Sequence, residues 1–203
     1  MGMAARTHPQ RDRLTWMGRF ALIGSPKSAQ DGSMPRLLPV ILAAAMAPLG
    51  IAHADELTIE GVGISRDVDC HGKDVGVYGA ENEIALTGRC GVITVHGSKH
   101  KVSFEEGKAL FVSGMDNTVK GGRAQDVTVS VTQNIVTATL GGGSAPGKLD
   151  TSGANNRVSL LLAGPTQLQV NGADHVVEWT RSEGAPNPDV TASGAKNVIK
   201  RKP

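Results

Sequence analysis

Aromatic side chains are scarce in this sequence of 203 residues, of which 3% are Phe, Trp or Tyr. Beyond residue 54 the aromatic residues are Tyr78, Phe104, Phe111 and Trp179. A globular sandwich of this size would normally fill its core with more large side chains. A narrow core built from thin stacked layers needs few of them, so the scarcity favours a stacked architecture.

The sequence also lacks an apolar run of the ~20 residues that a membrane span requires. Its apolar stretch at 37–51 follows Arg36 and ends in Ala-His-Ala at 52–54. These are the charged, apolar and small-x-small parts of a secretory signal peptide, although a packed core helix is an alternative. We predict a signal peptide over 34–54, cleaved after Ala54, and a periplasmic or secreted protein without a transmembrane segment in its mature chain.

Residues 1–33 are polar and show no hydrophobic periodicity. A signal peptide normally begins at its own Met, and Met34 is well placed to be that residue. We therefore interpret 1–33 as a disordered extension or a mis-assigned start. Residues 55–203 then form a β-repeat domain, whose length suits a single domain.

A strong excess of basic residues is missing as well. The formal net charge of the whole chain is +2, but residues 1–54 hold six of its 21 basic and two of its 19 acidic residues. The remainder is therefore slightly acidic, and its one basic cluster is the tail at 200–202. This balance disfavours nucleic-acid binding.

A repeat of about 18 residues runs through the mature chain. Its anchors lie 17 to 22 residues apart and are Gly61, Gly79, Gly97, Gly114, Val131, Gly153, Gly172 and Gly194. At most anchors, apolar residues recur four and two residues before the anchor, and five and seven residues after it. This alternation predicts two short strands per repeat, each with one buried face, joined by a turn at the glycine.

Repeats of one spacing argue for stacking, so we predict an all-β fold, a β-solenoid of about eight short coils that resembles a parallel β-helix. An antiparallel β-sandwich, prism or barrel would share the alternation, because periodicity does not define strand direction. Arg66 and Arg201 interrupt the apolar columns in the end repeats, as expected of coils that face solvent. The two longest intervals contain the predicted loops 141–147 and 181–188.

A polar column follows the anchors by three residues. After Ile64 in the first repeat it contains Asn82, His100, Asn117, Asn134, Asn156, His175 and Asn197. Stacked asparagine side chains can hydrogen-bond from coil to coil and to the turn backbone, so we interpret the column as a structural ladder. The two histidines lie several coils apart, too far to share a metal ion.

Only two cysteines are present, Cys70 and Cys90, and both follow the predicted cleavage site. Their separation of 20 residues is about one repeat, which would place them on neighbouring coils ~4.8 Å apart, within reach of a disulfide. Export to an oxidising compartment would permit the bond. We predict a Cys70–Cys90 disulfide; two free thiols or a redox pair are the alternatives, although no C-x-x-C spacing occurs.

The run Asp69-Cys70-x-Gly72, followed by Gly79-x-x-Asn82-x-Ile84-x-Leu86-Thr87-Gly88-x-Cys90 and by V-x-V-x-G-x-x-N/H units, resembles an exported bacterial family called domain of unknown function 3060. The resemblance spans roughly residues 68–200. His100 and His175 replace the usual Asn of the family pattern, and Val131 replaces an anchor Gly. The resemblance implies no particular activity.

No catalytic, metal-binding or cofactor-binding residues are predicted. The exposed positions before each anchor are small and polar, without the clustered carboxylates that acid–base catalysis needs. Asp67, Asp69 and Asp74 flank Cys70 but lack the spacing of a calcium loop, so we interpret them as solvated turn residues.

We therefore expect a non-enzymatic protein of the bacterial envelope that presents a solenoid surface to a protein or glycan partner. A carbohydrate-active β-helix enzyme with its site in the two loops is the alternative. The Thr and Ser columns leave ice or surface binding as a third interpretation. Acidic side chains that converge beside 141–147 or 181–188 would favour the enzyme, whereas a flat Ser/Thr/Asn surface would favour the scaffold.

Overall fold

The computed structural model describes residues 56–202, and all regular secondary structure in this range is β-strand. The predicted extension and signal peptide lie outside the described residues. No helix in this range could cross a membrane. The strands are β1 (Leu57–Val62), β2 (Ser65–Asp69), β3 (Val75–Ala80), β4 (Glu83–Ser98), β5 (Lys101–Met115), β6 (Thr118–Val129), β7 (Ile135–Leu140), β8 (Gly147–Thr151), β9 (Arg157–Leu162), β10 (Thr166–Ala173), β11 (Val176–Arg181), β12 (Asp189–Ala195) and β13 (Val198–Arg201).

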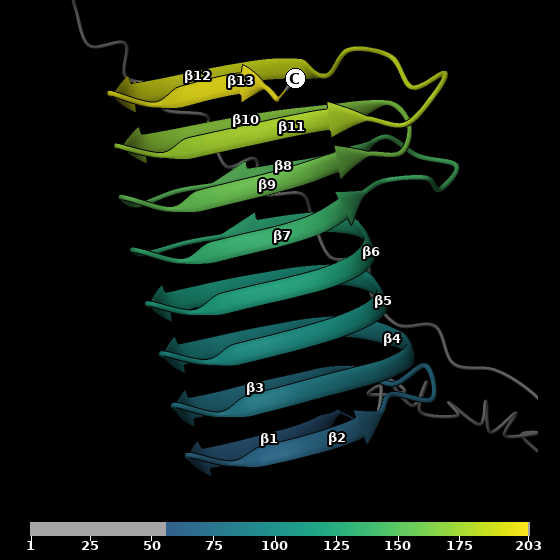
Figure 1. The fold of residues 1–203 in the computed structure, drawn as a ribbon, viewed down its shortest axis with the longest axis vertical. Coiled ribbons are helices and arrows are strands. Elements are labelled where there is room, and N and C mark those ends of the chain that lie inside the picture. Colours follow the sequence, from purple (N-terminus) through teal and green to yellow (C-terminus); the bar gives the residue numbers. More distant parts are fainter. Residues whose placement is uncertain (1–55, 203) are drawn as a thin grey trace, which may run out of the picture. The chain divides into compact units, whose positions relative to one another are not determined.

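Neighbouring strands pair in parallel throughout and wind upward in about eight coils, so the predicted β-solenoid is confirmed (Figure 1). Parallel pairing excludes the sandwich, prism and barrel alternatives with antiparallel strands. Each coil has two sides, which we call face 1 and face 2. Face 1 precedes the polar column and contains β1, β3, β8, β10, β12 and the second halves of β4, β5 and β6. Face 2 follows it and contains β2, β7, β9, β11, β13 and the first halves of β4, β5 and β6.

Two corners connect the faces. At the ladder corner, face 1 ends at the anchor and face 2 begins after the polar column. At the second corner the chain passes from face 2 to face 1 of the next coil. It does so within β4, β5 and β6, through short connections between β2 and β3 and between β9 and β10, and through loops between β7 and β8 and between β11 and β12. These two loops extend from the right-hand side of Figure 1.

The anchor glycines are required by close approach between coils. A Cβ atom on Gly79 would lie 2.0 Å from the carbonyl oxygen of Gly61, and one on Gly114 would lie 1.9 Å from that of Gly97. Val131 is the exception among the anchors: it adopts a φ of 72°, and around it the strand ladder is reduced to isolated bridges. Repeated steric contact, rather than turn formation alone, therefore explains the glycine column.

The core is a narrow interior filled by the predicted apolar columns. Ile84, Leu110 and Val158, for example, are almost fully buried. The largest inward side chains need local space: a Cβ on Gly121 would lie 1.9 Å from the ring of Phe104, so this glycine makes room for the ring in the coil before it. The Phe104 ring thus occupies space that a side chain at position 121 would otherwise fill.

The end coils are open. All residues of β12 are exposed, including the inward-facing Val190. Arg66 and Arg201, which interrupt the apolar columns, are also exposed. The ends therefore lack the neighbouring coil that buries each inner layer.

Candidate functional site

The ladder corner is a continuous hydrogen-bonded column of buried side chains. Asn117 shows the common pattern: its Nδ2 donates to the carbonyls of Gly97 (3.1 Å), in the preceding coil, and Ser113 (3.0 Å), in its own coil. Its Oδ1 accepts the backbone N–H of His100 at 3.0 Å. Each such residue therefore satisfies turn groups of two coils at once, which a buried corner requires.

The two histidines occupy equivalent places in the column. Nδ1 of His100 accepts the backbone N–H of Asn82 at 3.2 Å, and its Nε2 lies 3.3 Å from the carbonyl of His96. His175 repeats both contacts with Asn156 and Asn171. The ring nitrogens thus imitate the oxygen and nitrogen of an asparagine amide, a pattern that fits the neutral Nε2–H tautomer.

Burial lowers the pKa of His100 from its ordinary value of 6.5. Protonation would also place an Nδ1–H against the N–H of Asn82. Within residues 56–202, no group of three or more His, Cys, Asp or Glu side chains could hold a metal ion. All seven residues assigned to the ladder from the sequence lie in this column and bond to the turns, including Asn197, whose Oδ1 accepts the N–H of His175.

Cys70 and Cys90 form a disulfide with a Cα–Cα distance of 4.9 Å. Both are buried, at the second corner of the first coils. The bond therefore links β2 and β4 on the side where no ladder holds the chain.

Beside the loop after β7, the second corner carries mainly basic groups. A hollow of about 240 Å³ is lined by Arg89, Glu106, Lys108 and Arg123, together with Gln125 and glycines. Glu106 is the only carboxylate in this lining and lies 3.6 Å from the guanidinium of Arg89. The loop itself is held by Gln125, which donates to the carbonyl of Ala145 at 2.8 Å.

The loop after β11 is held by a basic side chain: Arg181 donates to the carbonyl of Ala185 at 2.9 Å. The loop after β7 thus lies beside Arg123 and Gln125, and the loop after β11 is held by Arg181.

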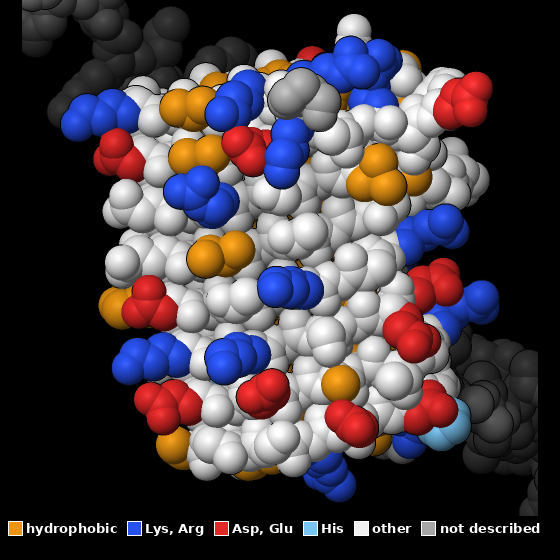
Figure 2. All heavy atoms as spheres, in the orientation of Figure 1, with side chains coloured by type: hydrophobic (Ala, Val, Ile, Leu, Met, Phe, Trp, Pro, Cys, Tyr) orange, Lys and Arg blue, Asp and Glu red, His pale blue; other side chains and the backbone are white. Residues whose placement is uncertain are grey.

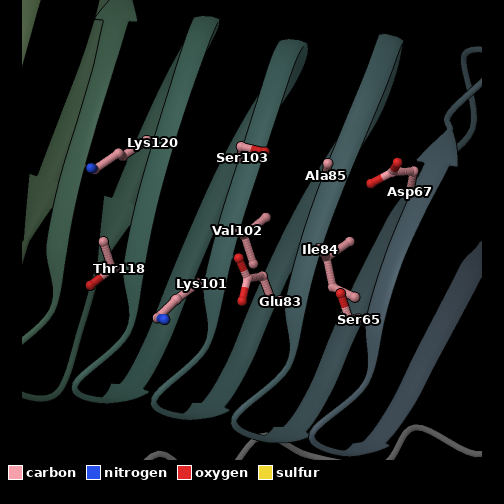
Figure 3. Close-up of a pocket in the computed structure, with 10 residues that line it drawn as sticks. All are labelled: Ser65, Asp67, Glu83, Ile84, Ala85, Lys101, Val102, Ser103, Thr118 and Lys120. Atoms are coloured by element: carbon pink, nitrogen blue, oxygen red, sulfur yellow. The ribbon is translucent and has the colours of Figure 1, made fainter.

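The outer surface of face 2 mixes charges of both signs with isolated apolar groups, as Figure 2 shows. A shallow hollow of about 280 Å³ crosses β2, β4, β5 and β6 (Figure 3). Its acids, Asp67 and Glu83, stand on the first strands, and its bases, Lys101 and Lys120, on the later ones. The charges are spread along the stack and do not converge on one point.

The outer surface of face 1 is different in its first four coils. Two rows of outward residues run along the stack in register. One row is Glu60–Tyr78–His96–Ser113, and the other is Thr58–Gly76–Thr94–Phe111.

Contacts link neighbours across these rows. The hydroxyl of Tyr78 donates to Glu56 at 3.0 Å, the rings of Tyr78 and His96 lie 6.5 Å apart, and Nδ1 of His96 lies 2.7 Å from the hydroxyl of Ser113. Partial burial and, after it, the carboxylate of Glu56 raise the pKa of Tyr78 above 10.0. The sequence showed these positions as exposed, but not the contact between Tyr78 and Glu56, which are 22 residues apart.

Comparison with known families finds one match. The model described as "Protein of unknown function (DUF3060)" matches residues 77–134, which run from β3 to the residue before β7. No curated protein and no solved structure matches. The matched segment contains the regular coils with four ladder residues and the Tyr78–Ser113 row.

Proposed function

We propose, from the premise that the chain carries the DUF3060 family domain, that it is an exported, non-enzymatic protein of the bacterial envelope whose solenoid presents a surface to a protein or glycan partner. The observation that carries this proposal is the outer surface of face 1. There, exposed polar and aromatic side chains stand in register on a backbone fixed by the ladder. A rigid surface reduces the ordering cost of binding an extended partner.

Two features support export. The apolar segment at 37–51 with its small-x-small end fits a secretory signal, and the Cys70–Cys90 disulfide fits an oxidising compartment. Expression of the full chain in a Gram-negative host tests this part. We expect a periplasmic or secreted product that begins at Asp55 by intact-mass analysis. A cytoplasmic product that retains residues 34–54 would contradict it.

Binding to envelope material tests the second part. We expect the exported protein to co-sediment with purified cell envelopes. A face 1 variant that combines Thr94→Lys with Ser113→Lys should no longer co-sediment. The matched face 2 variant, Ser103→Lys with Ser159→Lys, should behave as the wild type. Equal sedimentation of both variants, or none by the wild type, would contradict the proposal.

The second candidate, a carbohydrate-active enzyme, requires carboxylates at the second corner. Hydrolysis of a glycosidic bond normally uses two of them, and Glu106 is the one that lines the hollow there. Release of reducing ends that Glu106→Gln abolishes would favour the enzyme over the scaffold.

A further inference from the structure

The ring of Tyr78 lies directly over Gly76. A Cβ atom on Gly76 would lie 2.3 Å from Cε2 of Tyr78 and 2.8 Å from its hydroxyl oxygen. The side chain therefore folds back along its own strand instead of projecting from the sheet. The missing side chain at Gly76 is what allows an aromatic ring to rest on the surface of face 1.

This position brings the ring into the row of Phe111. Gly76 pairs with Thr94, and Thr94 pairs with Phe111, so two rings are aligned along the stack with a threonine between them. Two coils separate the rings, a distance of about 10 Å. Phe111 is 43% exposed. Because its side chain points outward, packing of the core does not explain an aromatic residue at this position. Of the four aromatic residues in the described range, these two point outward, and both are on face 1.

The polar groups around the rings suit hydroxyl groups of a ligand. Glu56 offers a carboxylate beside the Tyr78 hydroxyl, and Thr94, His96 and Ser113 supply further hydrogen-bonding groups. The charged residues on or beside face 1 from Glu56 to Met115 are three acids, Glu56, Glu60 and Asp74, and one exposed base, Lys108, at the edge next to the second corner. An acidic surface repels polyanions, so the complementary ligand carries no acidic groups.

The ladder holds the backbone under this surface. Asn82 donates to the carbonyl of Tyr78, His100 contacts that of His96, and Asn117 donates to that of Ser113. The strands that carry Tyr78, Thr94 and Phe111, namely β3, β4 and β5, are paired on both sides, so a peptide cannot add to the sheet at these strands by β-augmentation; the edge strand at this end of the stack is β1. Two exposed aromatic rings with hydroxyl-binding groups beside them instead suit sugar rings, whose C–H faces stack on aromatic faces.

We propose that face 1 binds an uncharged linear glycan that runs along the stack, with sugar rings packed on Tyr78 and Phe111. This inference rests on the proposed function and names its partner class. Glu56, Thr94 and His96 bond to the sugar hydroxyls.

Calorimetric titration of the exported protein tests the site with cellohexaose, chitohexaose and maltohexaose as probes and hexagalacturonate as the polyanionic comparison. We expect at least one uncharged hexasaccharide to bind and hexagalacturonate to bind more weakly. Tyr78→Ala and Phe111→Ala should each weaken binding about tenfold, while Tyr78→Phe, which keeps the ring, should weaken it about threefold or less.

Ile135→Ala is the matched control, because Ile135 is a 44% exposed apolar residue on face 2, and it should bind as the wild type. Thermal unfolding of each variant shows whether the fold is kept, and Phe111→Ala, at an outward position, serves if Tyr78→Ala does not fold. The inference is overturned if no uncharged hexasaccharide binds, or if both alanine variants still bind it as the wild type does. It is also overturned if a lysine heptapeptide, a basic peptide probe, binds and the hexasaccharides do not. Those results leave export and envelope binding standing, so failure here is distinguishable from failure of the proposed function.

Discussion

The ladder corner and the second corner differ in what holds successive coils together. At the ladder corner every inner coil repeats one hydrogen-bonding pattern, and residues such as Lys99 and Asp116 adopt left-handed φ values of 55° and 58° to fit it. At the second corner the register shifts between Leu86 and Arg89 and between Lys120 and Arg123. Buried polar bonds therefore hold the repeat constant on one side, while the other side admits both bulges and loops.

Gly97→Ala should break the ladder corner most severely. Its Cβ would lie 2.0 Å from the carbonyl oxygen of Gly79, and the backbone φ is 137°. We expect a loss of about 4 kcal/mol in the free energy of unfolding, measured by urea denaturation. Gly184→Ala, at a φ of 78° in the loop after β11 with no atom within 4 Å, is the control and should lose about 1 kcal/mol. Equal losses would show that close approach between coils is not what requires glycine.

Asn117→Ala should have the next largest effect. It leaves two half-buried carbonyls and the buried N–H of His100 without their partner, so we expect a loss of about 3 kcal/mol in the free energy of unfolding. Gln125→Ala removes two bonds at the exposed second corner and should lose about 0.5 kcal/mol. If both variants lose the same free energy of unfolding, the ladder has no special role in stability.

The disulfide should contribute somewhat less, since it strengthens only the first coils. Replacing Cys70 and Cys90 together by Ala should lower the free energy of unfolding by about 2 kcal/mol. Hydrogen exchange should then accelerate in β1 and β2 before β7 and β9. Uniform acceleration along the whole stack would contradict this local role.

His100→Asn should have the smallest effect and should depend on pH. The pKa of His100 is lowered by burial, so the unfolded chain takes up the proton first as the pH falls below about 6.5. The contribution of neutral His100 to the stability of the wild type should therefore be complete above this pH. It should decrease as the pH falls from about 6.5 to the lower pKa of the folded state. The Asn variant, which matches the neighbouring coils, should lose less between pH 7.5 and pH 5. Urea denaturation measures both proteins at the two pH values. Equal losses in the free energy of unfolding would show that the pKa of His100 does not differ between the folded and the unfolded state.

The columns that face the core could be predicted because each stacked coil imposes the same requirement on them. The ladder positions were visible for the same reason, since Asn recurs there or is replaced by a His with equivalent bonding atoms. Continuity of β4 through the second corner was not visible, because the corner residues do not keep one type from coil to coil: Arg89 pairs with Glu106, and Glu106 pairs with Arg123. The position of the Tyr78 ring was also hidden, because it depends on space above Gly76 and on Glu56, outside the repeat of Tyr78.

The most direct test of face 1 as the functional surface is an NMR titration of the exported protein with the three uncharged hexasaccharides. The account predicts amide shift changes at Tyr78, Thr94, His96 and Phe111, with loop amides unchanged. Changes confined to 141–147 or 182–188 would contradict it and would place the binding site at the second corner.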